Sequence, residues 1–262
     1  MRIKIIRLMA VLVLAVCTPQ LQAQAQAQTQ EREALKVLFI GNSYTYFWNL
    51  PQIITAMGER NGKAIMARKS TVGGTNLRQH WDGELGLNSR AMIENGDWDI
   101  VVLQNHSLST IDDFDEFMDY GGRFIDLVRQ SGATPMLYMT WAREFNPLMQ
   151  DKISAAYRLL GEQKGVEVVP VGEVWRMARE LRPDLDLFIG DGSHPTNYGT
   201  YLIACVFYSV LTDLPAQGLP ARLSTTDKNG EELIFTFIDP QDATFMQDVV
   251  DSYLLLNEAV MH

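Results

Sequence analysis

The 262-residue sequence has few of the features that mark disulfide-rich, metal-binding or nucleic-acid-binding proteins. Its two cysteines, Cys17 and Cys205, are too few for a disulfide framework, and no CxxC pair or HExxH segment predicts a zinc site. Its formal net charge of −10 provides no basic surface, so we expect no nucleic-acid partner. The nucleotide-binding patterns GxGxxG and GxxxxGKS/T do not follow the first predicted strand, and we expect no cofactor.

The first thirty residues differ in composition from the rest of the chain. Three basic residues within the first seven precede a short apolar run at 8–16 and several alanines, which is the pattern of a secretory signal peptide. We expect a signal peptide and disordered leader at 1–30, one domain at 31–262, and a periplasmic or secreted protein without stable membrane insertion after cleavage. Cys17 raises a lipoprotein alternative, but a valine precedes it where a lipobox has a small residue, which favours soluble export.

Beyond residue 30, short apolar segments alternate with segments of helical periodicity, and 47% of all residues are hydrophobic, enough for one sizeable core. Near-continuous apolar strands separated by helices are typical of a parallel sheet covered on both faces. The sequence therefore predicts an α/β fold, a three-layer α/β/α sandwich with a five-stranded parallel sheet, flavodoxin-like.

The expected strands are 36–40, 64–70, 99–103, 135–140 and 166–171, and the expected helices are 50–60, 77–95 (interrupted near 83–86), 114–130, 147–163, 197–211 and 242–260. A Lys-Asn-Gly sequence at 228–230 also predicts a hairpin between 223–225 and 233–237.

Polar residues follow the ends of the predicted strands. Ser43 follows the first strand, Gly74 the second, and Gln104 the third, while Asp191 and His194 stand late in the chain just before a predicted helix. In open parallel sheets, ligands bind at the carboxyl ends of the strands. The sequence therefore predicts a site at this edge of the sheet.

These residues resemble the sequence blocks of the SGNH (GDSL-like) hydrolase superfamily. The Gly-Asn-Ser sequence at 41–43 is similar to the first block, Gly-Asp-Ser, and Gly74 matches the glycine of the second. The Asp-Gly-Ser-His-Pro sequence at 191–195 matches the last block, and the resemblance extends over 36–214. The third block, Gly-x-Asn-Asp in the family, is replaced by Gln-Asn-His-Ser at 104–107, which is closer to the Gln-Gly-Glu type of carbohydrate O-acetylesterases.

The chemistry of a serine hydrolase needs three cooperating side chains. A serine hydroxyl becomes a nucleophile when a base removes its proton, and we expect Ser43 to be that nucleophile with His194 as the base. Asp191, three residues before His194, is expected to fix the tautomer and orientation of the imidazole. The three residues together predict an acyl-enzyme that water hydrolyses.

The oxyanion hole is where this sequence departs from the family. The backbone N–H groups of Ser43 and Gly74 are expected to supply two donors. Gln104 is favoured as the third over Asn105, because the third strand runs directly into Gln104 while strand alternation turns Asn105 to the opposite face. His106 lies further into the loop and is expected to contact substrate.

The substrate is expected to be a small-molecule or glycan ester with a short acyl group, most simply an O-acetyl ester on a carbohydrate. Trp48 and Trp141, near the predicted strand ends, would offer aromatic faces to a sugar. No amphipathic apolar lid is present for a long-chain lipase, and the resemblance does not choose among acetylesterase, thioesterase, lysophospholipase and arylesterase.

Two other functions remain open at this point. One is a secreted glycan-binding domain that has lost catalysis and uses Trp48, Trp81 and Trp141. The other is a metal-dependent hydrolase in which histidines 80, 106 and 194 hold zinc with Asp191, although their spacing matches no metal motif and we predict no metal site.

Overall fold

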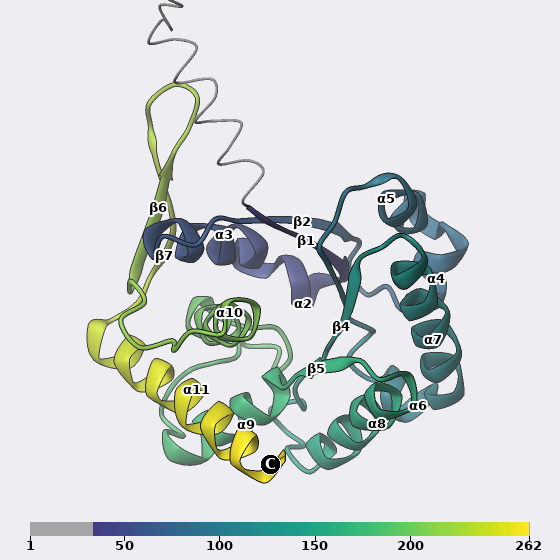
Figure 1. Cartoon of the computed structure of the whole chain (residues 1–262). Coiled ribbons are helices and arrows are strands. Elements are labelled where there is room, and N and C mark those ends of the chain that lie inside the picture. The colour runs from purple at the N-terminus through teal and green to yellow at the C-terminus, as the bar shows by residue number, and fades with distance from the viewer. Residues whose placement is uncertain (1–33, 262) are drawn as a thin grey trace, which may run out of the picture. The chain divides into compact units, whose positions relative to one another are not determined.

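The computed structural model describes residues 34–261, so the predicted signal peptide, the leader and Cys17 lie outside the described residues. The strands of its central sheet are β1 (Leu35–Gly41), β2 (Ile65–Thr71), β3 (Ile100–Leu103), β4 (Thr134–Tyr138) and β5 (Glu167–Val169). All four pairings are parallel and the strand order is β2-β1-β3-β4-β5 (Figure 1). The predicted five-stranded parallel sheet is therefore confirmed.

Helices cover both faces of this sheet. They are α2 (Ser43–Tyr46), α3 (Leu50–Arg60), α4 (Leu77–Asp82), α5 (Ser89–Asn95), α6 (Ser109–Asp112), α7 (Phe114–Gln130), α8 (Met149–Lys164), α9 (Val171–Leu181), α10 (Asn197–Thr212) and α11 (Pro240–Met261), with single 3₁₀ turns η1 (Phe47–Asn49) and η2 (Glu84–Gly86). Figure 1 shows α3, α9, α10 and α11 on one side of the sheet and α4, α7 and α8 on the other. The predicted three-layer sandwich is confirmed.

The side chains of β1 show why the sheet needs two layers of helices. Val37 and Phe39 belong to the core with α3 and α10, whereas Leu38 and Ile40 belong to the core with α7 and α8. Successive side chains of a strand point to opposite faces, so a strand that is apolar at every position must be covered twice. The same alternation in β3 decides which way the loop after it presents its side chains.

The helix α9 and the four-residue helices α2 and α6 were not predicted from the sequence. The apolar run expected to be a strand at 166–171 divides into the short β5 and the start of α9, with Pro170 at the boundary. Because the apolar residues continue from the strand into the helix without a polar break, the sequence does not show where the strand pattern changes to a helix pattern. The buried positions of α9 include Val171, Val174 and Ala178, which are three or four residues apart, as a helix face requires.

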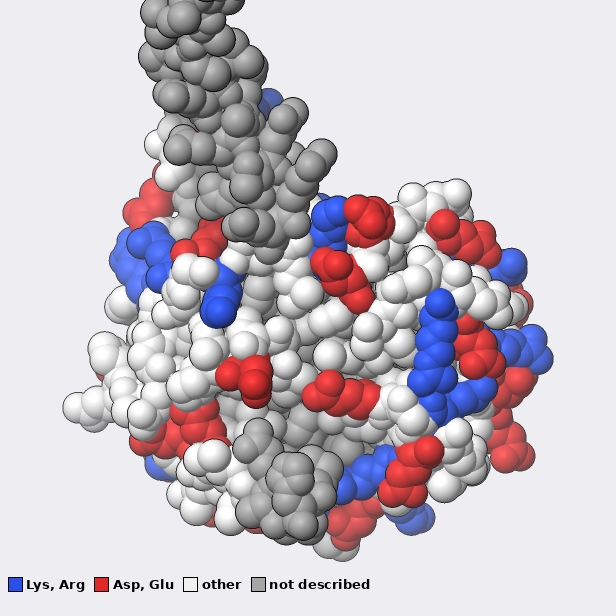
Figure 2. All heavy atoms as spheres, viewed as in Figure 1, with Lys and Arg blue, Asp and Glu red and all other residues white. Residues whose placement is uncertain are grey.

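The hairpin is confirmed as β6 (Arg222–Thr226) paired antiparallel with β7 (Glu232–Phe237). Asp227 stabilises the turn by accepting hydrogen bonds from the backbone N–H groups of Asn229 and Glu231. On the face drawn in Figure 2, acidic and basic side chains are interspersed. Among residues 34–261, no helix combines the length and the apolar character needed to cross a bilayer. Cys205 is buried in α10.

Candidate active site

Three side chains from two segments far apart in the sequence form a chain of hydrogen bonds at the carboxyl edge of the sheet. The Oγ of Ser43, at the start of α2, lies 2.8 Å from Nε2 of His194. The Nδ1 of His194 lies 2.6 Å from Oδ2 of Asp191. The sequence placed these residues at one edge, and the structure brings them into direct contact in the expected order. The imidazole therefore lies between a hydroxyl and a carboxylate.

The loop that carries the histidine is shaped by Asp191. Its second oxygen, Oδ1, accepts hydrogen bonds of 2.9 Å from the backbone N–H groups of Ser193 and His194. Burial pushes the pKa of Asp191 upward, but the hydrogen bonds from the imidazole and the two N–H groups outweigh it, so the pKa is lowered overall. The carboxylate is thus ionised at neutral pH and fixes both the loop and the ring.

Aromatic side chains hold the imidazole from two sides. The ring of Phe47 stacks on His194 with 4.5 Å between centroids, and Tyr44 meets it edge-on at 5.5 Å. Trp48 donates from Nε1 to the carbonyl of Pro195, at 3.0 Å. The sequence reasoning missed Tyr44 and Phe47, although four of the five residues after Ser43 are aromatic.

Asn42 explains the departure from the Gly-Asp-Ser pattern. Its Oδ1 accepts a hydrogen bond from the N–H of Tyr44, and so caps α2. Its Nδ2 donates to the carbonyl of Thr75 at 2.9 Å, which ties the nucleophile turn to the loop after β2. An ionised aspartate could make the first bond but not the second, because it has no N–H to donate. The asparagine therefore couples the turn of Ser43 to the loop of Gly74.

Two backbone N–H groups are available beside the nucleophile. Within residues 34–261, neither Ser43 nor Gly74 donates its backbone N–H to another protein group. Gly74 has a φ of +74°, and a Cβ there would meet no atom within 4 Å, so its backbone conformation rather than crowding calls for glycine. These free donors are what an oxyanion hole requires.

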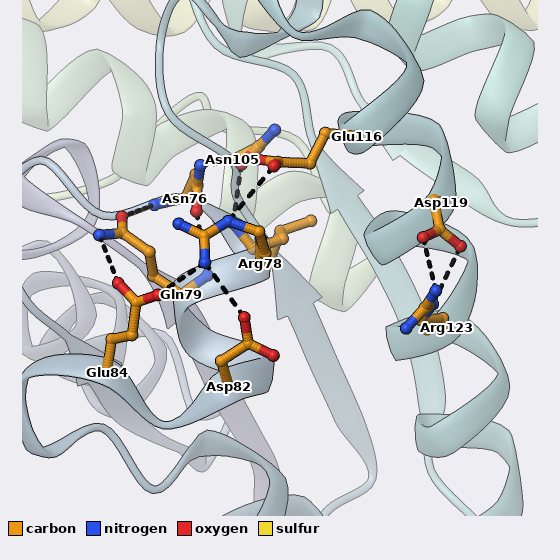
Figure 3. Close-up of polar contacts among 10 residues, drawn as sticks. Asn76, Arg78, Gln79, Asp82, Glu84, Asn105, Glu116, Asp119 and Arg123 are labelled. Carbon is orange, nitrogen blue, oxygen red and sulfur yellow. Dashed lines mark hydrogen bonds and ion pairs between the residues drawn. The ribbon is translucent and has the colours of Figure 1, made fainter.

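The loop that contains Gly74 is anchored from its far side. Asn76 and Gln79 form a capping box at the start of α4. Figure 3 shows the Nδ2 of Asn76 bonded to Glu116 of α7, while Arg78 contacts Glu116 and Glu84. This network joins α4 to α7 and leaves the Gly74 loop little freedom to move away from Ser43.

Gln104 does not reach the site in the way the sequence led us to expect. Its side chain is fully buried, and its Oε1 accepts hydrogen bonds from the N–H of Asn42 (2.9 Å) and the hydroxyl of Thr45 (3.0 Å). Its Nε2 donates to the carbonyl of Asn105. A Cβ at position 41 would overlap this amide, so Gly41 makes room for it. Gln104 braces the nucleophile turn from behind, and the expectation that it is the third donor is corrected.

Asn105 points toward the start of α4. Its Oδ1 accepts from the N–H of Leu77, at the start of α4, and Tyr157 accepts from its backbone N–H. Its Nδ2 donates to no group among the residues that the structure describes. Strand alternation holds as predicted, but the site lies on the α4 side, to which Asn105 points. Figure 3 shows Asn105 beside Asn76 on that side.

The aromatic residues predicted to bind substrate differ in how exposed they are. Trp141 is 1% exposed and lies in a stack, 4.3 Å from Tyr44 and 4.4 Å from Trp175, so it is a core residue and not a sugar platform. Trp48 is 48% exposed beside the histidine loop and remains available. Trp81 packs edge-on against Phe124.

The histidines do not form a metal site. His80 lies behind the nucleophile turn, where Nε2 donates to the carbonyl of Gly41 (2.9 Å) and Nδ1 contacts the hydroxyl of Ser89 (2.6 Å). Burial lowers the pKa of His80 to about 4, so its ring is neutral. His106 is half-buried in the loop after β3. No three histidine, cysteine or carboxylate side chains among residues 34–261 are arranged to hold a metal ion.

Buried polar side chains behind Ser43 thus form a second group, which we call the bracing cluster. It consists of Thr45, His80, Ser89 and Gln104. Their hydrogen bonds include those to the backbone of Gly41 and Asn42 and those that join Thr45 to Gln104 and His80 to Ser89.

Comparison with known proteins supports the fold. No protein-family model and no curated protein matches the chain by sequence. A DUF4886 family protein from Bacteroides uniformis superposes with a TM-score of 0.70 at 20% identity, covering 85% of this chain and 95% of its own. A protein from Slackia heliotrinireducens, described as a candidate SGNH hydrolase, superposes with a TM-score of 0.57 at 22% identity, covering 68% and 99%.

An acetyl xylan esterase superposes with a TM-score of 0.54 at 16% identity, covering 67% of this chain and 99% of its own. Identities this low establish a shared architecture and leave the reaction to be argued from the site. The strand order, the helices on both faces and these superpositions lead to one conclusion. The chain has the SGNH hydrolase fold.

Proposed function

We propose that this protein is a serine esterase with Ser43 as nucleophile, His194 as general base and Asp191 as the residue that orients the base. The observation that carries the proposal is the unbroken hydrogen-bond chain through the three residues, next to backbone N–H groups without protein partners. Each residue type alone is common at a strand end, but their contact in this order is the arrangement that activates a serine.

The reaction proceeds in two halves. As the Oγ of Ser43 attacks the ester carbonyl carbon, its proton passes to Nε2 of His194, and the ionised Asp191 stabilises the imidazolium. The tetrahedral intermediate then breaks its bond to the alcohol oxygen, which takes the proton from His194 and leaves. Water then attacks the carbonyl carbon of the acyl-enzyme while His194 takes its proton. The second tetrahedral intermediate breaks its bond to the Oγ of Ser43, which recovers the proton from His194, and the carboxylic acid is released.

Three donors are proposed to bind the oxyanion of each tetrahedral intermediate. They are the backbone N–H groups of Ser43 and Gly74 and the Nδ2 of Asn105. The hydrogen bond from Asn42 to Thr75 fixes the first two loops relative to each other, and the bond from Leu77 fixes the amide of Asn105. Donors held in place before the reaction need no reorganisation when charge develops on the carbonyl oxygen.

The proposed substrate is a short acyl ester, most simply an O-acetyl group on a carbohydrate. Trp48 supports a sugar ligand, because half of its indole is exposed beside the histidine loop. His106 is half-buried in the adjacent loop and is proposed to contact the alcohol part of the ester. The proposal includes export to the periplasm or medium, as the leader sequence predicts.

The test is acetate release from a panel of acetylated polysaccharides and from 4-nitrophenyl acetate. We expect turnover by the wild-type chain and none above background by Ser43→Ala. A fluorophosphonate probe should label Ser43 and no other serine, as read by mass spectrometry. Labelling elsewhere, or equal rates for the variant and the wild type, would refute the proposal and favour a glycan-binding role without catalysis.

A further inference from the structure

Arg143 is a charged residue at the site that the reaction proposed above does not use. It lies in the loop between β4 and α8 and is half-buried. One of its guanidinium nitrogens, Nη2, donates to the hydroxyl of Ser107 at 2.9 Å. Ser107 is itself buried in the loop after β3, two residues beyond Asn105. The guanidinium is therefore held by the same loop that carries the proposed third oxyanion donor.

The surroundings of Arg143 connect it to both catalytic loops. The hydroxyl of Tyr44, the residue after the nucleophile, lies 2.6 Å from the hydroxyl of Ser193, the residue before the base. Burial raises the pKa of Tyr44, and the hydroxyl of Ser193, the positive charge of Arg143 and the hydroxyl of Ser107 each oppose that rise. The backbone N–H of Glu144, the residue after Arg143, donates to the carbonyl of Gly192 at 2.9 Å, so the loop that carries Arg143 lies against the loop that carries Asp191 and His194.

Arg143 has no acidic partner in the described part of the chain. No aspartate or glutamate oxygen of residues 34–257 lies within ion-pair distance of it, whereas Arg158 and Arg176 on the neighbouring helices pair with Glu173 and Asp151. This is notable in a chain with 32 acidic residues. A partly desolvated charge is costly when it is unpaired, and such a charge beside a reaction centre is suited to pairing with a ligand.

The neighbouring histidine, His106, does not add a second positive charge beside Arg143. Burial and the guanidinium of Arg143 both lower the pKa of His106, so its imidazole is neutral at pH 7. A guanidinium has five N–H donors in a planar fork, and among the residues that the structure describes only the hydroxyl of Ser107 accepts from Arg143. The remaining donors match the two oxygens of a carboxylate.

We propose that Arg143 is the centre of an anion-binding subsite and that the preferred substrates carry a carboxylate on the alcohol part of the ester. This rests on the proposed function, since it names the substrate class of the same site. Arg143 fixes the acidic group of the substrate by a charge-assisted, two-point hydrogen bond, and so orients the ester carbonyl toward Ser43. Ser107 is a positioning residue for the guanidinium.

The experiment uses matched esters that differ by one charge. Acetoxybenzoic acids and the corresponding acetoxybenzamides have the same acyl group and nearly the same shape, and the ortho, meta and para isomers place the acidic group at three distances from the ester. Rates are corrected for the spontaneous hydrolysis of each compound, which in the ortho acid is assisted by its own carboxylate. We expect the wild-type protein to prefer at least one acid over its amide by about ten- to hundredfold in kcat/KM, chiefly through KM.

Variants of two arginines test which cation causes the preference for the acid over the amide. Arg143→Met should reduce the acid-to-amide ratio to near one, and Arg143→Lys should restore part of it. Arg129→Met is the matched control, because Arg129 lies at the end of α7, at the opposite edge of the sheet, and donates only to backbone carbonyls. It should keep the wild-type ratio. An equal loss on acid and amide in Arg143→Met would overturn the inference and assign Arg143 to oxyanion binding or folding.

The failure of this inference can be told from the failure of the proposed function. If the wild type hydrolyses the acetyl esters of the acetoxybenzamides through Ser43 but shows no preference for any acid, that result refutes the anion-binding subsite and leaves the proposed esterase function intact. If no ester is hydrolysed, calorimetric binding of hydroxybenzoates to the wild type and to Arg143→Met still tests the subsite. Weaker binding to the variant supports it, and equal binding overturns it.

Discussion

Two groups of polar side chains flank the nucleophile turn, and each contains a histidine. In the reactive group, His194 joins Ser43 to the carboxylate of Asp191 and keeps 27% of its side chain exposed. In the bracing cluster, His80 is 1% exposed, and its ring nitrogens bond to the carbonyl of Gly41 and the hydroxyl of Ser89. The first histidine has a carboxylate partner and access to substrate, and the second has neither.

The comparison shows that residue type at a strand end does not distinguish a reacting group from a bracing one. Gln104 and Asn105 are neighbouring amides, yet the first has its carbonyl oxygen committed to the nucleophile turn and the second has a free Nδ2. The two groups differ in whether all of their hydrogen-bond donors and acceptors are already paired with other protein groups, as they are in the bracing cluster. The predictions below test that separation, beginning with the largest effect.

Removing a member of the reactive group should nearly abolish turnover. We expect Ser43→Ala and His194→Ala each to lower kcat by about 10⁴-fold or more, because the triad acts as a unit. The double variant should be no worse than either single one. Steady-state kinetics on 4-nitrophenyl acetate provides the rates, and circular dichroism should show an unchanged fold. Additive losses in the double variant would contradict a shared mechanism.

Asn105→Ala should lower kcat by about 10²–10³-fold, since one oxyanion donor is lost. Asn105→Asp is the sharper variant, because a carboxylate still accepts the hydrogen bond from Leu77 but offers no N–H to the oxyanion. Both variants should keep KM for a neutral acetyl ester near the wild-type value. If Asn105→Asp retains full turnover, the third donor must be another group.

Stability should depend on pH through His80. Its pKa is about 4 in the folded chain, below the ordinary value near 6.5, so the unfolded chain binds more protons between these values. The free energy of unfolding should therefore fall by up to about 3 kcal/mol as pH falls from 7 to 4. Chemical denaturation at several pH values measures this.

The control for that pH dependence is His80→Gln, which should lose most of the change between pH 6.5 and 4. Asp191 also has a lowered pKa, but protonation of an aspartate destabilises the fold only as pH falls below about 5. The change between pH 6.5 and 5 therefore reports on His80 without Asp191. A wild-type profile that is flat between pH 6.5 and 4 would mean that His80 is not held neutral.

Gln104→Ala should act mainly on stability. It leaves the N–H of Asn42 and the hydroxyl of Thr45 without their buried acceptor, which should cost about 1–3 kcal/mol of unfolding free energy. The loss of kcat should be smaller than that of Asn105→Ala at a temperature where both are folded. A variant as stable as the wild type but catalytically impaired would place Gln104 in the reactive group after all.

The sequence was sufficient to predict the sheet, most of the helices and the meeting of Ser43 with His194. These features follow from period and from order along the chain, which a sequence displays directly. The boundary between β5 and α9 was hidden because both are apolar on either side of Pro170. Which amide of Gln104 and Asn105 faces the site depends on which layer of helices the site lies against, and a strand pattern does not contain that information.

Trp141 was misassigned for a related reason. An aromatic residue after a strand is equally compatible with a core and with a binding surface, and only its neighbours decide between them. Here Tyr44 and Trp175 lie on its two faces, and both come from distant parts of the chain. Contacts between distant segments are what sequence reasoning lacks, and they determine most of the fine structure of this site.

The bond between Ser43 and His194 joins residues 151 positions apart in the chain. A nascent or partly unfolded chain therefore lacks the contact between this hydroxyl and this imidazole. The site comes into being only after the intervening strands and helices have docked and α10 has packed against the sheet. The proposed catalysis is thereby conditional on complete folding.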